Sequence, residues 1–308
     1  MNKSALKVFD AITPPQFAPH VGCDRAYVDT GAGFYIAPGV WLPSWWKDGW
    51  NGPKEKIDED ALARMADNLP ERPTWTLNIW EGRYDVRNSK NDVEKVVDEI
   101  RNKILIPIHK RRPDIRRSFF ASIPSEHYDI TIYHQALQMK RRFDAGENIP
   151  NAAWWLNRLK EVEPRYKAWV NAVNRLTYGF DDNTGRLDTG GGLLDELDAL
   201  VTKNYLVGDQ SDGAYDALDI ESDKFAITEQ VSQAKRVSNG RLVFSIQTPY
   251  IEQTNDKPKE HRLELAMRVS RDAGADGLIL WHYTGGRMPS PWEEKTMDMG
   301  VREFSRAV

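Results

Sequence analysis

Short apolar runs alternate with longer amphipathic stretches along this chain of 308 residues, and no other feature limits its possible folds so strongly. The short runs have the length and composition of strands and lie at 33–37, 74–79, 117–123, 214–220, 241–247 and 277–282. The longer stretches place apolar residues at helical spacing and lie at 57–68, 92–106, 132–178, 193–201, 228–237, 261–273 and 295–307. Repeated strand–helix units of this kind predict a parallel sheet covered by helices.

The number of units favours an α/β fold of the (β/α)8 TIM-barrel type, irregular or with seven strands. Further strands are expected within 26–30 or 205–208. A doubly wound open sheet is the alternative, but it requires a glycine-rich phosphate loop after its first strand. The segment Gly31-Ala32-Gly33 is too short and precedes the strand. We therefore expect one barrel domain over 1–308, with an irregular Trp-rich loop region at 1–56.

Charge and cysteine content exclude several classes of function. The net charge is −4 and the pI is about 5.9, so nothing draws the whole chain to nucleic acid or anionic lipid. No apolar run is long enough for membrane insertion and no signal peptide is visible. We expect a soluble protein: cytoplasmic, released by lysis, particle-associated, or a mature secreted form. A single cysteine, Cys23, excludes a disulfide framework, and the six scattered histidines predict neither a metal site nor a cofactor.

Aromatic residues are the most unusual part of the composition, with 11 Trp, 11 Tyr and 10 Phe. Several tryptophans, among them Trp41 and Trp50, lie between Pro, Gly, Asp and Lys in loop-like contexts. Exposed rings of this kind stack on sugars or nucleobases, and the net charge argues against nucleobases. The candidate substrate-binding residues are Trp45, Trp46, Trp80, Tyr84, Tyr128, Tyr250, Trp281 and Tyr283. A purely structural role in the core is the alternative for Trp281.

Carboxylates follow several predicted strands, where a barrel gathers its catalytic residues. Asp219 and Glu221 lie two residues apart at the end of the strand predicted over 214–220, so their side chains are expected on one face. Two close carboxylates keep one proton between them, as a general acid for a glycosidic oxygen requires. Solvated or ion-paired acids at a strand end are an equally weighted alternative.

Glu81 is the second candidate acid, because it directly follows the strand predicted over 74–79. The neighbouring Arg83 offers a structural ion pair as the alternative reading. Glu126 and Glu252 also follow predicted strands and are weaker candidates. No nucleophile elbow for a serine hydrolase is present.

Six segments also resemble a known family in their order along the chain: TLNIWEG, FFASIPSEHYD, YKAWVNAVNRL, YDALDIESDKF, LVFSIQTPYIE and ADGLILWHYTGG. Together, over 74–286, they are similar to barrel glycosidases of the hyaluronidase-like type and their uncharacterised bacterial relatives. The resemblance implies a barrel whose D-x-E glutamate is the acid and whose substrate supplies an acetamido nucleophile. Asp219 and Glu221 match that pair by type.

The bacterial relatives place the acidic strand end nearer to the segment Asn78 to Glu81. Asn78 stands where those proteins have an aspartate, and the glutamate is shifted by one residue. The resemblance therefore leaves both Glu81 and Glu221 as candidate acids.

These observations predict a glycoside hydrolase that cleaves a polysaccharide with paired carboxylates and aromatic subsites. The alternative is a non-catalytic carbohydrate-binding barrel of a cell surface or viral particle, which needs the tryptophans but not the acids. A polysaccharide lyase or sugar isomerase is a third reading, which requires a metal or a base such as Tyr128 with His127.

Overall fold

Seven strands form a parallel sheet at the centre of the molecule, in the order β6-β5-β2-β1-β11-β10-β9. Every neighbouring pair in this sheet is parallel. The strands are β1 (Lys7–Ala11), β2 (Asp24–Asp29), β5 (Thr74–Leu77), β6 (Arg116–Phe119), β9 (Ala199–Lys203), β10 (Leu242–Gln247) and β11 (Gly277–Trp281). Two small antiparallel pairs lie outside it: β3 (Phe34–Ala37) with β4 (Val40–Leu42), and β7 (Phe180–Asp181) with β8 (Arg186–Leu187).

The computed structural model describes the chain at 7–14, 17–29, 34–37, 40–42, 59–68, 74–77, 101–114, 116–119, 127–175, 180–181, 186–187, 196–206, 217–251, 255–282, 284 and 286–305. Its helices are α1 (Glu59–Asn68), the π-helical turn η2 (Arg101–Leu105), α3 (Ile106–Arg111), α4 (His127–Asp144), α5 (Ala152–Arg175), α6 (Ala217–Val237), α7 (Glu260–Asp272) and α8 (Pro291–Ser305). None of these helices combines the length and the apolarity needed to cross a membrane.

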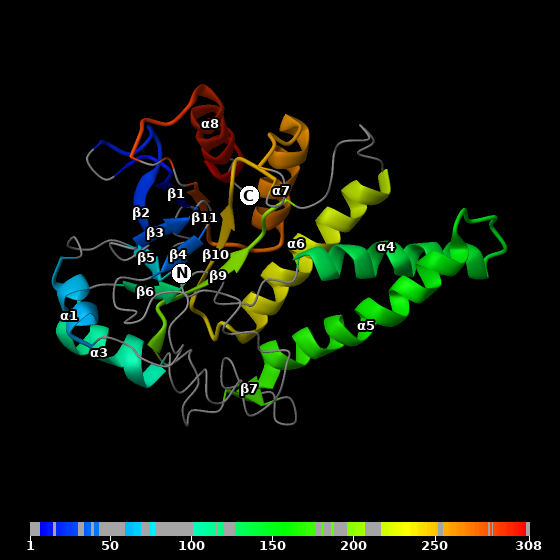
Figure 1. Ribbon diagram of the computed structural model, residues 1–308, viewed down its shortest axis with the longest axis horizontal. Helices are drawn as coiled ribbons and strands as arrows, with labels where there is room; N and C mark the ends of the chain where they lie inside the picture. Colours follow the sequence, from blue (N-terminus) through cyan, green and yellow to red (C-terminus); the bar gives the residue numbers. More distant parts are fainter. Residues whose placement is uncertain are drawn as a thin grey trace.

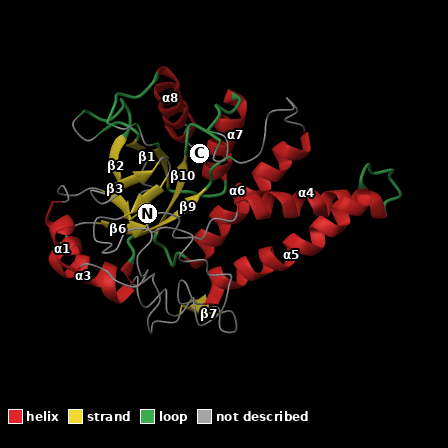
Figure 2. Ribbon diagram, viewed as in Figure 1, coloured by secondary structure: helices red, strands yellow, loops and turns green. Residues whose placement is uncertain are grey.

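Helices surround the strands, as Figure 2 shows. The helices α6, α7 and α8 lie along one part of the sheet, and α1 and α3 lie near its other end (Figure 1). The helices α4 and α5 pack against each other as a long hairpin that extends away from the sheet (Figure 1). Their base contacts α6, so the hairpin is attached to the sheet through that helix.

Apolar side chains cover both faces of the part of the sheet formed by β1, β9, β10 and β11. On β10, Val243 belongs to the cluster between sheet and helices, while Phe244 and Ile246 belong to a second cluster on the opposite face. Phe9 of β1 meets Phe244 in this second cluster, with ring centroids 5.2 Å apart. Both faces of β9 and β10 are covered, since every residue of these strands except Leu242 is buried.

A glycine allows three strands to approach closely where the second cluster begins. A Cβ atom on Gly277 would lie 2.7 Å from the carbonyl oxygen of Lys7 and 3.0 Å from the Phe244 ring. Any other residue would therefore push β11 away from β1 at this point.

Much of the predicted strand pattern is confirmed. The strands predicted at 74–79, 117–123, 241–247 and 277–282 correspond to β5, β6, β10 and β11, and the one expected within 26–30 corresponds to β2. Within the region 1–56, for which an irregular loop with strands at 33–37 and within 26–30 is expected, the structure adds the unexpected strand β1, which lies in the middle of the sheet. The run at 33–37 forms a strand outside this sheet.

Two segments differ from their predicted structure. The strand expected over 214–220 is wrong, since α6 begins at Ala217 and continues to Val237. The helix expected over 193–201 is also wrong at its end, because β9 occupies Ala199–Lys203. An apolar run of this length fits either a buried strand or one face of a helix, and packing against α4 and α7 selects the helix for α6.

The two edge strands of the sheet, β6 and β9, contact each other. No hydrogen-bonded ladder joins them within the described residues. The sheet is therefore strongly curved, with its first and last strands brought together.

Candidate site at the carboxyl edge of the sheet

The carboxyl ends of all seven strands lie at one edge of the parallel sheet, where α/β proteins bind their ligands. Three aromatic residues stand at this edge on neighbouring strands. Tyr205 follows β9, Tyr250 follows β10, and Trp281 ends β11. The candidate site is built around these rings and the polar residues that hold them.

Tyr205 and Trp281 form the floor of the site. Their rings are stacked with centroids 6.3 Å apart and planes inclined by 10°. Tyr205 is buried, with 5% of its surface exposed, whereas Trp281 is half-buried. The Lys203 ammonium lies 5.0 Å from the centre of the Tyr205 ring, which adds a cation–π contact. The buried Tyr205 ring thus packs against the partly exposed Trp281 ring.

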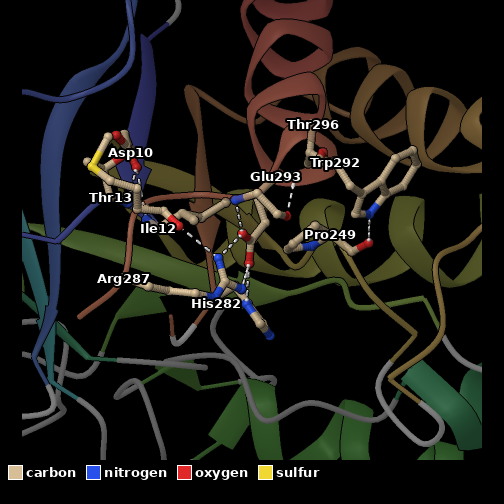
Figure 3. A network of polar contacts seen from close by, with 11 residues as sticks. Asp10, Ile12, Thr13, Pro249, His282, Arg287, Trp292, Glu293 and Thr296 are labelled. Atoms are coloured by element: carbon tan, nitrogen blue, oxygen red, sulfur yellow. Dashed lines mark hydrogen bonds and ion pairs between the residues drawn. The ribbon is translucent and has the colours of Figure 1, made fainter. Parts of the chain in front are cut away.

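A fully buried carboxylate, Glu293, contacts His282, the residue that follows Trp281. Glu293, in the first turn of α8, accepts hydrogen bonds from Arg287 Nη1 at 2.7 Å and Nη2 at 3.0 Å. It also accepts from the backbone N–H of Ser290 at 2.6 Å and lies 2.8 Å from Nδ1 of His282. Figure 3 shows these groups converging on Glu293 from the start of α8 and from the segment after β11.

These contacts fix the charge states around Glu293. Burial opposes ionisation, but the hydrogen bonds from Arg287, Ser290 and His282 outweigh it and lower the Glu293 pKa to about 2. The hydrogen bond to Glu293 raises the Arg287 pKa. Burial lowers the His282 pKa, although Glu293 opposes that shift. At neutral pH the cluster holds an ion pair beside an uncharged imidazole.

Tyr250 connects this cluster to the strand next to β11. Its ring lies 4.5 Å from that of His282, at an inclination of 51°. Trp292 of α8 fixes the preceding residue, because its indole N–H donates to the carbonyl oxygen of Pro249 at 2.7 Å. The start of α8 therefore positions the loops that follow both β10 and β11.

Asp10 organises the segment after β1. Its buried carboxylate accepts the backbone N–H groups of Ile12, Thr13 and His20, each at 2.9 Å. His20 in turn contacts Asp298 of α8 at 2.9 Å. Asp10 is thus fully occupied with backbone donors, and Figure 3 shows it near the Glu293 cluster.

The structure separates the carboxylates that were expected to act as a pair. Asp219 and Glu221 lie in the first turns of a helix, where residues two apart point about 200° from each other. Asp219 accepts a hydrogen bond from Gln135 of α4 at 2.7 Å. Glu221 is exposed and pairs with Lys224 at 2.7 Å. The expectation that both lie on one strand face is wrong, because the segment is helical.

The other predicted site residues divide into two groups. Tyr250 and Trp281 stand at the carboxyl edge as described, and Tyr128 lies in the first turn of α4. Outside the described residues lie Trp45, Trp46, Trp80, Glu81, Tyr84 and Tyr283.

Sequence reasoning did not identify Arg287 or Glu293. A glutamate in an amphipathic helix is expected to be exposed to solvent. A signal was nevertheless present, since Ser290-Pro291-Trp292-Glu293 has the S-x-x-E pattern of a capping box, with proline at the first helical position. The pattern marks the start of α8. It also accounts for the hydrogen bond that the backbone N–H of Ser290 donates to the Glu293 carboxylate.

A cavity of about 560 Å³ lies elsewhere, between α1 and α3. Helical residues line it, among them Glu59, Lys103 and Arg111. Neither this cavity nor the carboxyl edge holds a cluster of three His, Cys, Asp or Glu side chains suited to a metal, as far as the described residues extend.

No protein-family model matches the sequence, and no curated protein matches it. Bee venom hyaluronidase is similar in structure with a TM-score of 0.43 and 11% identity, covering 98% of this chain and 88% of that one. Bee venom hyaluronidase in complex with a hyaluronic acid tetramer is similar with a TM-score of 0.28 and 14% identity, covering 64% of this chain and 69% of that one. A GH5-4 broad specificity endoglucanase from Bacteroides salanitronis is similar with a TM-score of 0.32 and 12% identity, covering 99% of this chain and 94% of that one. All three TM-scores lie below 0.5.

Proposed function

We propose that this chain is a glycoside hydrolase that binds a polysaccharide across the carboxyl edge of its parallel sheet. The observation that carries this proposal is the stacked pair of Tyr205 and Trp281, with Tyr250 on the next strand. A half-buried indole backed by a buried ring offers a flat apolar face whose orientation is already fixed. Such a face suits the C–H surface of a pyranose ring and loses little conformational entropy on binding.

We also propose that the sheet closes into a seven-stranded barrel. The contact between β6 and β9 supports this, because it brings the two ends of the strand order together. In a barrel, the segments after β5 and β6 would open onto the same pocket as those after β10 and β11.

Glu81 is the proposed general acid. It follows Leu77 by four residues in the sequence, and Leu77 is the carboxyl end of β5. The two buried carboxylates described at this edge are already occupied: Asp10 by backbone N–H groups, and Glu293 by Arg287 and His282. An acid catalyst must hold a proton near neutral pH, and a carboxyl with a pKa of about 2 does not.

Glu81→Gln tests this assignment. Hyaluronan and a mixed-linkage β-glucan are offered as substrates, and new reducing ends are measured. General acid catalysis contributes about 10²–10⁴-fold, so this variant should lose nearly all turnover and still bind the polymer that the wild type cuts. Glu221→Gln is the matched control, since that exposed carboxylate pairs with Lys224, and it should cut at the wild-type rate. Wild-type turnover in Glu81→Gln would reject Glu81 as the acid.

A non-catalytic carbohydrate-binding protein is the second candidate function. The observation in its favour is that Asp10 and Glu293 serve to hold loops in place. Binding of a polymer that is lost in Trp281→Ala, without cleavage of any polymer by the wild type, would select this function over hydrolysis.

A further inference from the structure

We propose that His282 accepts a hydrogen bond from a hydroxyl group of the bound sugar through Nε2, and that Glu293 holds the imidazole in the tautomer that makes this possible. This inference rests on the proposed polysaccharide site. It assigns a substrate-contacting role to a histidine that the sequence does not mark.

The tautomer follows from the partner of Nδ1. An ionised carboxylate only accepts hydrogen bonds, so Nδ1 of His282 donates its proton to Oε1 of Glu293, 2.8 Å away. The neutral ring then carries its lone pair on Nε2. Figure 3 shows the imidazole below Glu293, with its far end directed away from the carboxylate.

The ring is also fixed in place. Arg287 and the backbone of Ser290 hold Glu293 from two further directions, so the carboxylate cannot rotate away from His282. Tyr250 covers the imidazole at 4.5 Å between ring centroids. A preorganised acceptor binds a hydroxyl group with little loss of side-chain freedom.

The position suits contact with a ligand. The His282 side chain is 21% exposed, and the residue directly follows the half-buried Trp281. A sugar ring that lies against Trp281 and Tyr250 would bring its hydroxyl groups to this side of the cluster.

The charges around His282 determine how the acceptor responds to pH. The described titratable and charged groups that face it are Glu293 on α8, Arg287 before α8, and Tyr250 after β10. Burial lowers the His282 pKa below its ordinary value of 6.5, against the opposing effect of Glu293. The neutral acceptor is therefore present at pH 7 and is lost as the pH falls through the lowered pKa.

The first experiment examines the ring without any sugar. Protein labelled with ¹⁵N-histidine is titrated by NMR, and Gln replaces His282 in a second sample to assign the signals. We expect a neutral ring protonated at Nδ1, with a pKa below 6.5. A neutral ring protonated at Nε2 would overturn the proposal, because that nitrogen could then only donate.

The second experiment measures binding of cellotetraose and a hyaluronan tetrasaccharide by calorimetry between pH 5 and 8. His282→Phe keeps an aromatic ring against Tyr250 but removes the acceptor, and should weaken binding about 3- to 10-fold at pH 7. His282→Gln retains an acceptor that does not titrate, and should restore most of the affinity and remove its loss at acid pH. His109→Phe, at an exposed histidine of α3, should bind as the wild type does.

The outcomes separate this inference from the proposed function. Wild-type affinity in His282→Phe, with an unchanged pH profile, overturns the role of His282 and leaves the polysaccharide site intact. If the wild type binds neither tetrasaccharide, the proposed polysaccharide site is overturned. The proposal that a sugar hydroxyl donates to His282 is then overturned as well. Weakened binding in His282→Phe, rescued by His282→Gln, supports both.

Discussion

Arg262 of α7 holds Asp223 of α6 in a buried ion pair, with Nε 2.8 Å from Oδ2 and Nη2 3.3 Å from Oδ1. The two side chains are 5% and 4% exposed. This pair joins two neighbouring helices that cover the sheet, near the start of each.

Asp223→Ala should lower the free energy of unfolding by about 3–5 kcal/mol, because it removes one charge of a buried, hydrogen-bonded ion pair. Urea denaturation at pH 7 measures the change. Glu221→Ala in the same turn of α6 is the control, since the exposed pair with Lys224 contributes little. Equal effects of the two substitutions would contradict the buried character of the Asp223–Arg262 pair.

Glu293→Gln should alter the dependence of stability on acid. The Glu293 pKa is about 2 in the folded protein against an ordinary 4.5, so its stabilisation is complete above pH 4.5 and is lost as the pH falls towards 2. The contribution is about 3 kcal/mol at most. Urea denaturation at pH 7, 5, 4 and 3 should show Glu293→Gln less stable than the wild type at pH 7 and less sensitive to acid. Glu294→Gln, on the exposed side of the same turn, should follow the wild-type curve.

Cys23 should be unreactive in the folded protein. Burial, together with the nearby carboxylates Asp10, Asp24 and Asp298, raises the pKa of its thiol to about 12. The thiolate is the form that attacks Ellman's reagent, and it is almost absent at pH 8 when the thiol pKa is about 12. Ellman's reagent at pH 8 should label Cys23 slowly in native protein and rapidly in urea. Rapid labelling of native protein would show that the packing of Cys23 against the core is wrong.

Gln247→Met should leave the free energy of unfolding unchanged or raise it by about 1–3 kcal/mol. The Gln247 side chain at the end of β10 is fully buried, and within the described chain neither its Oε1 nor its Nε2 has a hydrogen-bond partner. An unsatisfied buried amide is costly, and methionine has a similar shape without polar groups. Thermal and urea unfolding measure the effect. Gln233→Met is the contrast, because Gln233 contacts Glu229 and Arg236 and should lose stability. A strongly destabilised Gln247→Met would indicate an internal water bound to the amide.

The strands β10 and β11 could be predicted from the sequence, and β1 could not. Apolar residues predominate in β10 and β11 and polar residues flank both runs, so their limits are visible. The strand β1 was not predicted because it is short and contains Asp10, a charged residue that is buried only because three backbone N–H groups surround it. Those donors come from the loop after β1, which the local sequence does not reveal.

The site divides in the same way. Tyr250 and Trp281 could be placed at the carboxyl edge, because position at a strand end is a local property. The role of Glu293 depends on residues before its helix and on His282 after a different element, so only the assembled structure brings them together. Asp219 and Glu221 were misplaced because the prediction of their pairing depended on a strand, and the segment is helical.

The pairing of β1 with β11 has a consequence for how the chain folds. Residues 7–11 pair with residues 277–281, which lie about 270 positions later in the sequence. During synthesis, this side of β1 stays uncovered until residues 277–281 have left the ribosome. Closing so large a loop is entropically costly and slows folding. A nascent chain stalled before residue 277 would therefore expose the edge of β1, making it a substrate for chaperones and prone to aggregation.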